Sequence, residues 1–209
     1  MTTALLQTTY FGPVQWYQKL NRYDHCVIEQ HDTYQKQTYK NRCVIATANG
    51  LQALTVPVEV SSNREEVKDV RISDHNNWRK VHWHALQSAY SESPFFDYYV
   101  DDIRPFFEKK YAFLIDFNEA IRQTICELVD IHPSVEYSLE FRVHGSGFMV
   151  QGSGFKDFRE VIHAKHPQED AEFEARPYWQ VFQHRYGFQP NLSILDLLFC
   201  MGPESVFYL

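Results

Sequence analysis

Alternating apolar and polar residues open the chain. Residues 3–8 alternate and are rich in strand-forming side chains, so we predict a strand there. Gly12 and Pro13 end this run, and Pro13 suits the first turn of a helix over residues 13–24. A short apolar run at residues 25–30 predicts a second strand. A strand, a helix and a strand in so short a stretch form a βαβ pattern, which favours a parallel pair.

The clearest local pattern is a β-hairpin. Two apolar, strand-like runs lie within residues 42–60 and are separated by Asn49 and Gly50. This dipeptide is typical of a type I′ turn, which joins antiparallel strands. Because the opening unit favours parallel pairing, the chain is expected to form a mixed sheet.

Helical spacing dominates the middle of the chain. Apolar residues recur every three to four positions over residues 78–90, and Asp74 or Asn76 is placed to cap this helix. Prolines break a second helical region at residues 91–111. A long helix is then predicted over residues 112–131.

A strand is predicted at residues 135–143, and an irregular segment at residues 142–177. Two helices follow, at residues 178–190 and 191–202. The irregular segment contains a twice-repeated GSGF, which indicates turns and a flexible loop. Asn191 or Ser193 is placed to cap the last helix. Together these elements predict an α/β fold in one domain over residues 1–209: a mixed central sheet opened by a βαβ unit, with a β-hairpin and packed C-terminal helices.

Charge and hydropathy exclude two classes of function. The net charge is −7, from 20 basic and 27 acidic residues, and no basic stripe is present, which argues against nucleic-acid binding. No apolar run approaches the length of a membrane span, and the first residues lack the features of a signal peptide.

The four cysteines are far apart, at Cys26, Cys43, Cys126 and Cys200. Each lies in an apolar run, as reduced core cysteines do. No CxxC pair occurs, so neither a zinc knuckle nor a dithiol redox motif is predicted. We therefore expect a cytoplasmic protein.

Two histidines, His82 and His84, lie on the predicted helix at residues 78–90. Residues two apart on a helix point about 200° apart, so this pair cannot bind one metal ion. His82 shares an apolar stripe with Trp78, so we expect His82 to be buried and His84 to be exposed. The sequence leaves two roles open for His82: a packed histidine bonded to a backbone carbonyl, or a catalytic base.

Polar residues stand beside tyrosines in the connection after the second strand. Lys36 and Arg42 would suit an anionic group, and Tyr39 a sugar face or a nucleobase, although a solvated loop would have the same composition. Asp196 lies in an otherwise apolar helix, so it pairs with a group such as His82 or Arg42, or lies at the helix rim. A second polar set comprises Asp157, Arg159, His163 and Lys165.

Two catalytic patterns are missing. The sequence has no GxSxG, which argues against an α/β-hydrolase. Only Cys43 has an arginine or lysine directly beside it, Arg42, so a cysteine nucleophile is not favoured. The opening βα unit is similar to that of nucleotidyltransferases with an H-x-G-H motif at a helix N-terminus, but residues 10–20 contain no histidine.

Several segments follow the order and spacing of one family, at residues 10–20, 27–43, 49–58, 77–99 and 191–203. They contain an aromatic-Pro turn, a Lys followed by Asn-Arg, and a hairpin that ends in Pro-Val. A Trp-x-Lys-x-His helix and a Ser-Ile-x-Asp-Leu-Leu-Phe helix follow. Over residues 10–125 and 155–205 the chain resembles the WbqC-like protein family.

This resemblance implies a role in modifying a sugar. Members are often encoded among genes for O-antigen and other surface glycans, and their proposed reaction attaches an amino acid or acyl group to an amino sugar. The positions that match the family are Tyr10, Lys36, Asn41, Arg42, Trp78, Lys80, His82, Tyr90, Pro94, Ser193 and Asp196. The chain departs from many members at Trp16, where they have glycine, and in a shorter segment around 142–160, which resembles the branch typical of Bacteroidetes.

The leading hypothesis is a transferase that needs neither metal nor cofactor. His82 would be the general base and Asp196 would orient it, while Lys36 and Arg42 would hold a diphosphate or carboxylate. The expected substrate-binding residues are Tyr10, Tyr17, Lys36, Tyr39, Asn41, Arg42, Trp78, Lys80 and Ser193. The ligands would be a nucleotide-sugar or amino sugar and an activated acyl donor, and the protein could form a homo-oligomer. Two alternatives are a non-catalytic protein that binds a nucleotide-sugar or glycan precursor, and a degenerate nucleotidyltransferase.

Overall fold

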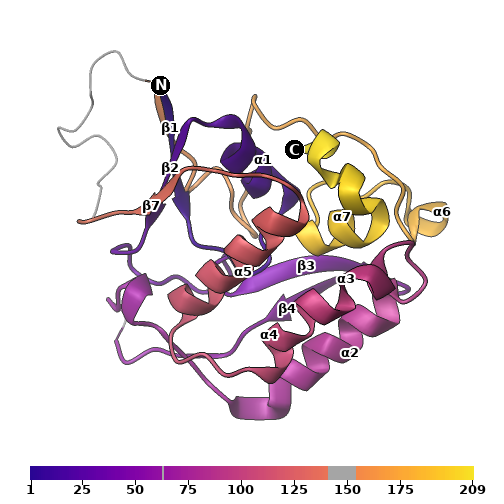
Figure 1. The fold of residues 1–209 in the computed structure, drawn as a ribbon. Coiled ribbons are helices and arrows are strands. Elements are labelled where there is room, and N and C mark those ends of the chain that lie inside the picture. The colour runs from indigo at the N-terminus through magenta and orange to yellow at the C-terminus, as the bar shows by residue number, and fades with distance from the viewer. Residues whose placement is uncertain (63, 141–153) are drawn as a thin grey trace.

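The central sheet is parallel (Figure 1). The computed structural model describes residues 1–62, 64–140 and 154–209. Within them, the strands of this sheet run in the order β7-β2-β1-β8 and comprise β1 (Thr2–Gln7), β2 (His25–Glu29), β7 (Val135–Tyr137) and β8 (Gly154–Asp157). β1 lies between β2 and β8, so Leu5 pairs with Val27 on one side and with Asp157 on the other. The antiparallel pairs β3–β4 and β5–β6 lie outside this sheet.

The predicted βαβ unit is confirmed. Helix α1 (Val14–Arg22) connects β1 to β2, and the two strands pair in parallel. Pro13 occupies the N-cap position, one residue before the helix begins. The preceding turn requires Gly12, because a Cβ atom there would lie 2.4 Å from Thr9 Oγ1. α1 packs its apolar face inward, with Trp16 only 1% exposed.

The predicted hairpin is present, but its turn is not type I′. The strands are β3 (Arg42–Thr47) and β4 (Gly50–Thr55). Thr47 pairs with Gly50, so the turn residues are Ala48 and Asn49, and neither has a positive φ. Gly50 instead has a φ of 102°. A type I′ turn needs two residues with positive φ, which Ala48 resists, so the glycine takes the left-handed position one residue later.

The helices in the middle of the chain lie where the sequence predicts helical structure, but the cap residue predicted for the first of them is wrong. They are α2 (Trp78–Tyr90), α3 (Phe96–Ile103), α4 (Pro105–Glu108) and α5 (Leu114–Leu128). Neither Asp74 nor Asn76 caps α2; its N-cap residue is Asn77, without a side-chain cap. The Asp74 carboxylate instead binds Arg79 and Lys110, each at 2.6 Å, and these charged donors outcompete a backbone N–H.

The C-terminal helix is confirmed with its cap. α7 (Ile194–Met201) begins after Ser193, whose Oγ accepts a hydrogen bond from Leu195 N. The predicted helix over residues 178–190 is wrong except for α6 (Gln183–Tyr186). Gly187, with a φ of 69°, ends α6 after one turn. The remaining short elements are β5 (Val58–Glu59), β6 (Arg71–Ile72) and the 3₁₀ helices η1 (Val67–Asp69), η2 (His75–Asn77) and η3 (Gly202–Tyr208).

Two predictions around the GSGF repeat need correction. The segment expected to be irregular, residues 142–177, contains β8, because these four residues complete the sheet beside β1. The strand expected at residues 135–143 is limited to β7, and residues 138–140 are not in a strand. Residues 141–153, with most of the repeat, lie outside the described residues.

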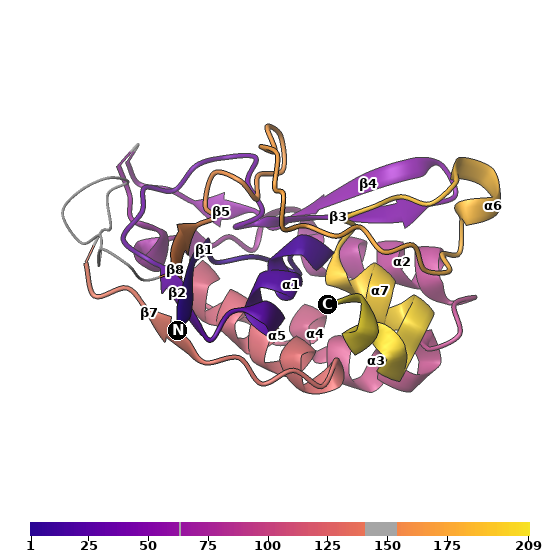
Figure 2. The same cartoon turned by 90° about the horizontal axis from the view of Figure 1, so that it is seen from above.

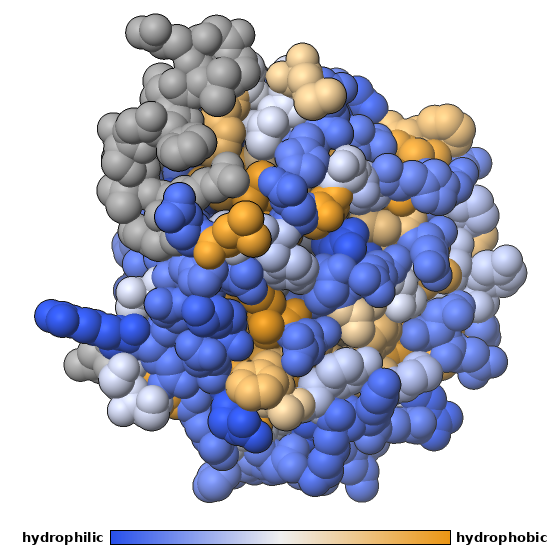
Figure 3. Space-filling model, turned by 60° about the vertical axis from the view of Figure 1, so that its left-hand side comes forward, coloured by the Kyte–Doolittle hydropathy of each residue, from blue (hydrophilic) through white to orange (hydrophobic). Residues whose placement is uncertain are grey.

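Helices and the hairpin pack around an aromatic core. Viewed from above, the β3–β4 hairpin lies across α2 and α7, both of which contact β3 (Figure 2). In this core, the Tyr10 ring stacks on Phe117 with centroids 5.7 Å apart, and Phe11 stacks on Phe107 at 6.1 Å. The face shown in Figure 3 is mostly hydrophilic, with hydrophobic residues in separate patches. The predicted α/β class, with its βαβ unit, hairpin and packed C-terminal helices, is confirmed. The described strands of the central sheet pair only in parallel, and the antiparallel pairs that make the fold mixed form separate sheets.

Candidate functional site

Polar side chains stand at the carboxyl ends of the parallel strands. β1 ends with Gln7, β2 with Glu29 and β8 with Asp157, and these strands are neighbours. Gln7 and Glu29 are 3% and 0% exposed. In open parallel sheets, ligands bind outside the carboxyl ends of the strands. This edge, which we call the carboxyl edge, is therefore the candidate functional site.

An ion-pair network centres on Glu29. Its Oε1 accepts hydrogen bonds from Ser138 Oγ at 2.7 Å and from His31 N at 2.8 Å. Its Oε2 lies 3.7 Å from Arg159 Nη1, and Arg159 Nη2 lies 2.7 Å from Asp157 Oδ2. Burial alone would lower the pKa of Arg159, but Asp157 and then Glu29 raise it. The network therefore fixes a charged guanidinium at the end of β8.

A buried lysine belongs to the same cluster. Lys40 is 2% exposed, and its Nζ lies 2.8 Å from Asp32 Oδ2. The charge of Asp32 also acts on Arg159. Gln7 Nε2 donates to the backbone oxygens of Arg159 and Ile162, at 3.2 and 2.6 Å, and so holds this segment over the edge. Buried ion pairs are poor stabilisers, so this concentration of charge favours a role in binding or catalysis.

Three buried oxygen atoms have no hydrogen-bond partner among the described residues: Thr9 Oγ1, Asn41 Oδ1 and Asn118 Oδ1. Asn118 Nδ2 donates to Lys40 O at 2.8 Å, and Asn41 Nδ2 donates to a backbone oxygen at 2.7 Å. These bonds fix both amide orientations, because only the NH₂ group can face a carbonyl. Buried acceptors are rarely left unpaired, so these atoms suit the N–H or O–H groups of a ligand.

His31 lies at the rim of the carboxyl edge. Its Nδ1 is 2.9 Å from Glu66 Oε2, and Lys68 Nζ lies 2.8 Å from the same oxygen. An ionised carboxylate only accepts, so the Nδ1 bond to Glu66 requires the tautomer with the proton on Nδ1. Lys68 Nζ, 3.1 Å from Nδ1, could donate to that nitrogen only in the other tautomer. We assign the Nδ1–H tautomer, because Lys68 is already paired with Glu66, whose pKa is lowered by Lys68 and then by His31. In that tautomer, Nε2 of a neutral His31 can accept a proton.

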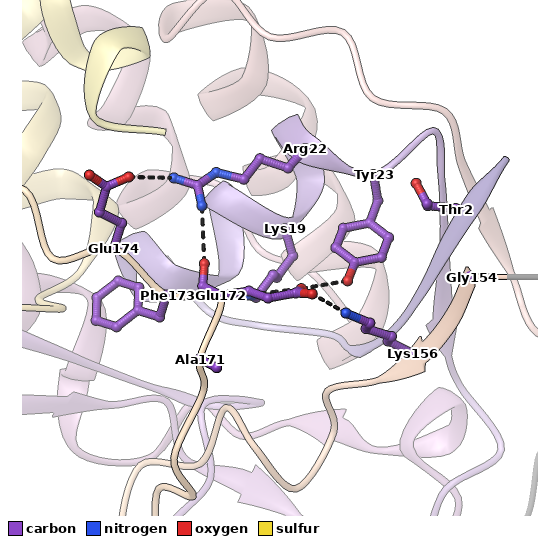
Figure 4. Close-up of a pocket in the computed structure, with 10 residues that line it drawn as sticks. All are labelled: Thr2, Lys19, Arg22, Tyr23, Gly154, Lys156, Ala171, Glu172, Phe173 and Glu174. Carbon is purple, nitrogen blue, oxygen red and sulfur yellow. Dashed lines mark hydrogen bonds and ion pairs between the residues drawn. The ribbon is translucent and has the colours of Figure 1, made fainter.

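Two recesses lie at opposite ends of the sheet. One, of about 360 Å³, is lined by Gln30 and Tyr137, at the carboxyl ends of β2 and β7, and by α5. The other, of about 770 Å³, is lined by Thr2 and Gly154, at the amino ends of β1 and β8, and by α1 (Figure 4). Volume favours the second recess, whereas the strand-end rule for parallel sheets favours the first.

The sequence-predicted base, His82, is buried at 5% exposure, as expected. Its Nδ1 lies 2.9 Å from Tyr10 Oη, and the backbone of Thr55 also bonds the ring. Burial lowers the pKa of His82 to about 4, against the effect of the Thr55 bond. Trp78 packs edge-on against the ring at 5.1 Å. These contacts favour the packed histidine, and the role as a base stays a prediction.

Asp196 is held by neutral donors. It is 1% exposed and accepts hydrogen bonds from Tyr90 Oη at 2.9 Å, Tyr178 Oη at 2.7 Å and Gln180 Nε2 at 2.8 Å. Burial raises its pKa, and these bonds oppose the shift. The pairing that we expected with His82 or Arg42 is not formed, because three neutral donors satisfy the carboxylate without a cation.

The other sequence-predicted site residues divide among three environments. Tyr10 N donates to Tyr39 O at 2.9 Å, which places both beside Asn41 and the carboxyl edge. Lys36 and Lys80 are exposed. Tyr17, Trp78 and Ser193 are buried in the core, and Arg42 is half-buried with its Nε bonded to Thr55 Oγ1 at 3.1 Å. None of the predicted residues lines either recess.

The sequence analysis identifies part of the cluster. Asp157 and Arg159 belong to its second polar set, but it does not identify Glu29, His31 or Lys40. A signal for Glu29 and His31 was present, because they, like Asp157, stand at or directly after strands whose carboxyl ends meet. No pattern in the sequence indicates Lys40, because only the tertiary structure shows that it pairs with Asp32.

The start of α1 does not provide a phosphate site. Val14 N donates to Leu192 O at 3.0 Å, and Gln15 N donates to Asn191 Oδ1 at 2.9 Å. Phosphate binding at a helix N-terminus requires free N–H groups. These bonds, with the absent histidine motif, give no support to a nucleotidyltransferase mechanism at this turn.

Other classes of site find little support in the described residues. The four cysteines are free and buried, and burial raises the pKa of Cys43 to about 12 and of Cys126 to about 11, which disfavours a reactive thiolate. No group of three or more His, Cys, Asp or Glu residues in this part of the chain is placed to hold a metal ion. No described helix is both long enough and apolar enough to cross a bilayer.

Comparison with known proteins places this fold in a family. The WbqC-like protein family matches residues 7–208. The chain is similar to an uncharacterised protein, Rv1507c, of Mycobacterium tuberculosis, with 26% identity over 225 residues that cover 99% of this chain and 96% of the relative. No solved structure matches the chain. Because the family match spans nearly all of the sequence, the chain belongs to the WbqC-like protein family.

Proposed function

We propose that this protein is a transferase that attaches an acyl or aminoacyl group to an amino sugar during the synthesis of a surface polysaccharide such as an O-antigen. The family resemblance supports the substrate class. The observation that carries the proposal is the buried, charged cluster at the carboxyl edge, with unpaired acceptor oxygens beside it. We assign the reaction to the cytoplasm, where four buried free thiols would stay reduced.

The unpaired acceptors support a sugar as the ligand. Three buried oxygens have no hydrogen-bond partner among the described residues and can accept from a ligand: Asn41 Oδ1, Asn118 Oδ1 and Thr9 Oγ1. An amino sugar presents several donors, namely its hydroxyl groups and its amine. A site that leaves buried acceptors unpaired rejects a ligand that lacks those donors, so these atoms would supply specificity.

His31 is our candidate for the general base, in place of His82. Its Nδ1 bond to Glu66 would orient Nε2, as a carboxylate orients the histidine of a catalytic triad. Nε2 would take the proton of the sugar amine while the amine nitrogen forms a bond to the donor carbonyl carbon. The bond from that carbon to the leaving group then breaks. Lys40 and Arg159 would attract the anionic part of the donor.

Replacing the ion pair between Asp32 and Lys40 with apolar side chains distinguishes a role in ligand binding from a role in stability. In the variant Asp32→Leu with Lys40→Met, we expect an unfolding free energy within about 1 kcal/mol of wild type or higher, because apolar side chains replace a buried ion pair well. A thermal-shift screen with nucleotide-sugars, acyl-CoA and aminoacyl donors should then show a ligand that raises the melting temperature of the wild type but not of this variant.

Matched controls make this result specific. Arg104→Met with Glu108→Leu removes an exposed ion pair and should keep the ligand response. His31→Gln should keep ligand binding but lose turnover by roughly a hundredfold or more. A ligand that stabilises wild type and the Asp32/Lys40 variant equally would refute the carboxyl edge as the site.

A non-catalytic binding protein is the second candidate. It is favoured by the contacts of His82, whose ring is bonded by the Tyr10 hydroxyl and by the backbone of Thr55. A binding protein would not need a titrating base, so the affinity for the ligand would be flat between about pH 5 and 8, the range in which histidine titrates. Saturable ligand binding by the wild type, with no transfer product from any donor, would favour this candidate.

A further inference from the structure

An acidic segment closes one side of the recess at the amino end of the sheet. Residues 171–174 line the recess beside α1, and the side chains of Glu172 and Glu174 point toward the opposite wall of the recess (Figure 4). That wall carries Lys19 and Arg22 from α1, Tyr23 after it, and Lys156 from β8. The recess is thus bounded by three cationic side chains on one wall and acidic side chains on the other.

The carboxylate of Glu172 lies where the donors converge. Tyr23 Oη donates to Oε2 at 2.6 Å, and Lys19 Nζ lies 3.9 Å from the same oxygen. Lys156 forms an ion pair with Oε1, and Arg22 Nη1 donates to the Glu172 backbone oxygen at 3.0 Å. Cationic and phenolic donors that meet around one carboxylate form the kind of site that binds an oxyanion.

The acidic segment is held firmly at one end. Asp170 Oδ2 lies 2.8 Å from Lys19 Nζ and accepts a hydrogen bond from Gln15 Nε2 at 2.8 Å. The Lys19 and Asp170 side chains are 1% and 5% exposed. Breaking this pair would leave an uncompensated buried charge, so Asp170 is a fixed anchor.

The next part of the segment is held loosely. The side chains of Glu172 and Lys156 are 39% and 52% exposed, and those of Glu174 and Arg22 are 58% and 32% exposed. Water and salt screen such pairs, so they contribute little to stability. The Glu172 carboxylate can therefore leave the recess while Asp170 stays in place.

We propose that this recess is a second binding site, for a small ligand bearing a phosphate or similar oxyanion, and that Glu172 occupies it in the unliganded protein. The oxyanion would replace the Glu172 carboxylate against Lys156, Tyr23 and Lys19. A doubly charged phosphate attracts these donors more strongly than one carboxylate does. The site lies at the opposite end of the sheet from the carboxyl edge, and it does not depend on the proposed transferase function.

Phosphate binding to the full chain tests this site. Inorganic phosphate and pyrophosphate are titrated into the protein in a calorimeter at constant ionic strength. A titration with chloride is the control for a general effect of salt. Glu172→Gln removes the competing carboxylate but keeps the side-chain shape, and it should tighten binding by about tenfold. Glu169→Gln is the matched control, because Glu169 is a nearby exposed residue, and it should change affinity by less than about twofold.

A second variant locates the bound anion. Adding Lys156→Met to Glu172→Gln should abolish the gain in affinity, whereas adding Lys165→Met, at an exposed lysine elsewhere, should not. Phosphate should also speed chymotrypsin cleavage after Phe173 in the wild type, because the segment is released. Equal affinities of Glu172→Gln and Glu169→Gln, or no saturable phosphate binding in any variant, would overturn the proposal.

Discussion

At the scale of the residue, burial decides the chemistry of His82. The helical stripe in the sequence predicts that this side chain is buried, and its 5% exposure confirms it. The stripe could not identify its partners, because Tyr10 and Thr55 are distant in sequence. Burial without a charged partner lowers the pKa to about 4, so the imidazole is neutral at physiological pH.

The shift makes His82 an acid-sensitive element of the fold. Its pKa is about 4 when folded and about 6.5 when unfolded, so the unfolded state binds the proton more tightly. The associated stability is present above about pH 6.5 and is lost as pH falls toward 4. Between about pH 7.5 and 5, His82 should account for a loss of about 2 kcal/mol in the free energy of unfolding.

Urea unfolding at several pH values measures this loss. In His82→Ala, the free energy at neutral pH should fall by about 2–4 kcal/mol, since a cavity and an unpaired Tyr10 hydroxyl remain. The loss on acidification should shrink by about 2 kcal/mol relative to wild type. His84→Ala, at the exposed histidine of the same helix, is the control and should change neither quantity by more than about 0.5 kcal/mol. An unchanged pH dependence in His82→Ala would contradict the assignment.

At the scale of the element, local signals predicted where most elements lie, and backbone sterics decided their details. The hairpin appears where Asn49 and Gly50 indicate it, yet only Gly50 takes a positive φ. β8 was missed because its four residues are stabilised by pairing with β1, which is about 150 residues away in sequence. The helix predicted over 178–190 is limited to α6, because Gly187 ends it and the preceding Tyr178 and Gln180 side chains bond Asp196.

The hairpin turn makes a prediction about Gly50. Its φ of 102° is strained for any other residue, whereas a Cβ atom there would meet nothing within 4 Å. Gly50→Ala should therefore cost about 1–2 kcal/mol from backbone strain alone, measured by urea unfolding. Ala48→Gly, in the same turn at a position without positive φ, should cost less than about 1 kcal/mol. A Gly50→Ala protein as stable as wild type would rule out this turn.

At the scale of the whole molecule, strand order decides which groups can act together. β1 lies between β2 and β8, so Gln7, Glu29 and Asp157 meet at one edge although they are widely separated in sequence. The amino ends of β1 and β8, at Thr2 and Gly154, instead line the recess proposed to bind an anion. Because the strands are parallel, the proposed catalytic and anion sites lie toward opposite ends of the sheet.

Strand order also predicts how the molecule opens. β1 and β2 are inner strands, so their amide hydrogens should exchange only when the whole protein unfolds. β7 and β8 are edge strands within the described sheet, so their amide hydrogens should exchange through smaller, local openings. Hydrogen exchange followed by NMR should show slower exchange at Leu5 and Val27 than at Glu136 and Lys156, by an order of magnitude or more. Equal protection of all four strands would argue that the sheet opens as one unit.

The sequence by itself determined the family, the α/β class, the opening βαβ unit and the burial of His82, and it limited the cap of the last helix to Asn191 or Ser193. These follow from periodicity, turn residues and the order of motifs, which are local or cumulative along the chain. Only the tertiary structure decided which polar groups meet. Lys40 with Asp32, Arg159 with Glu29, and Asp196 with its neutral donors are set by strand order and packing. Contacts between residues far apart in sequence leave no periodic signal, so side-chain chemistry alone could not select these partners.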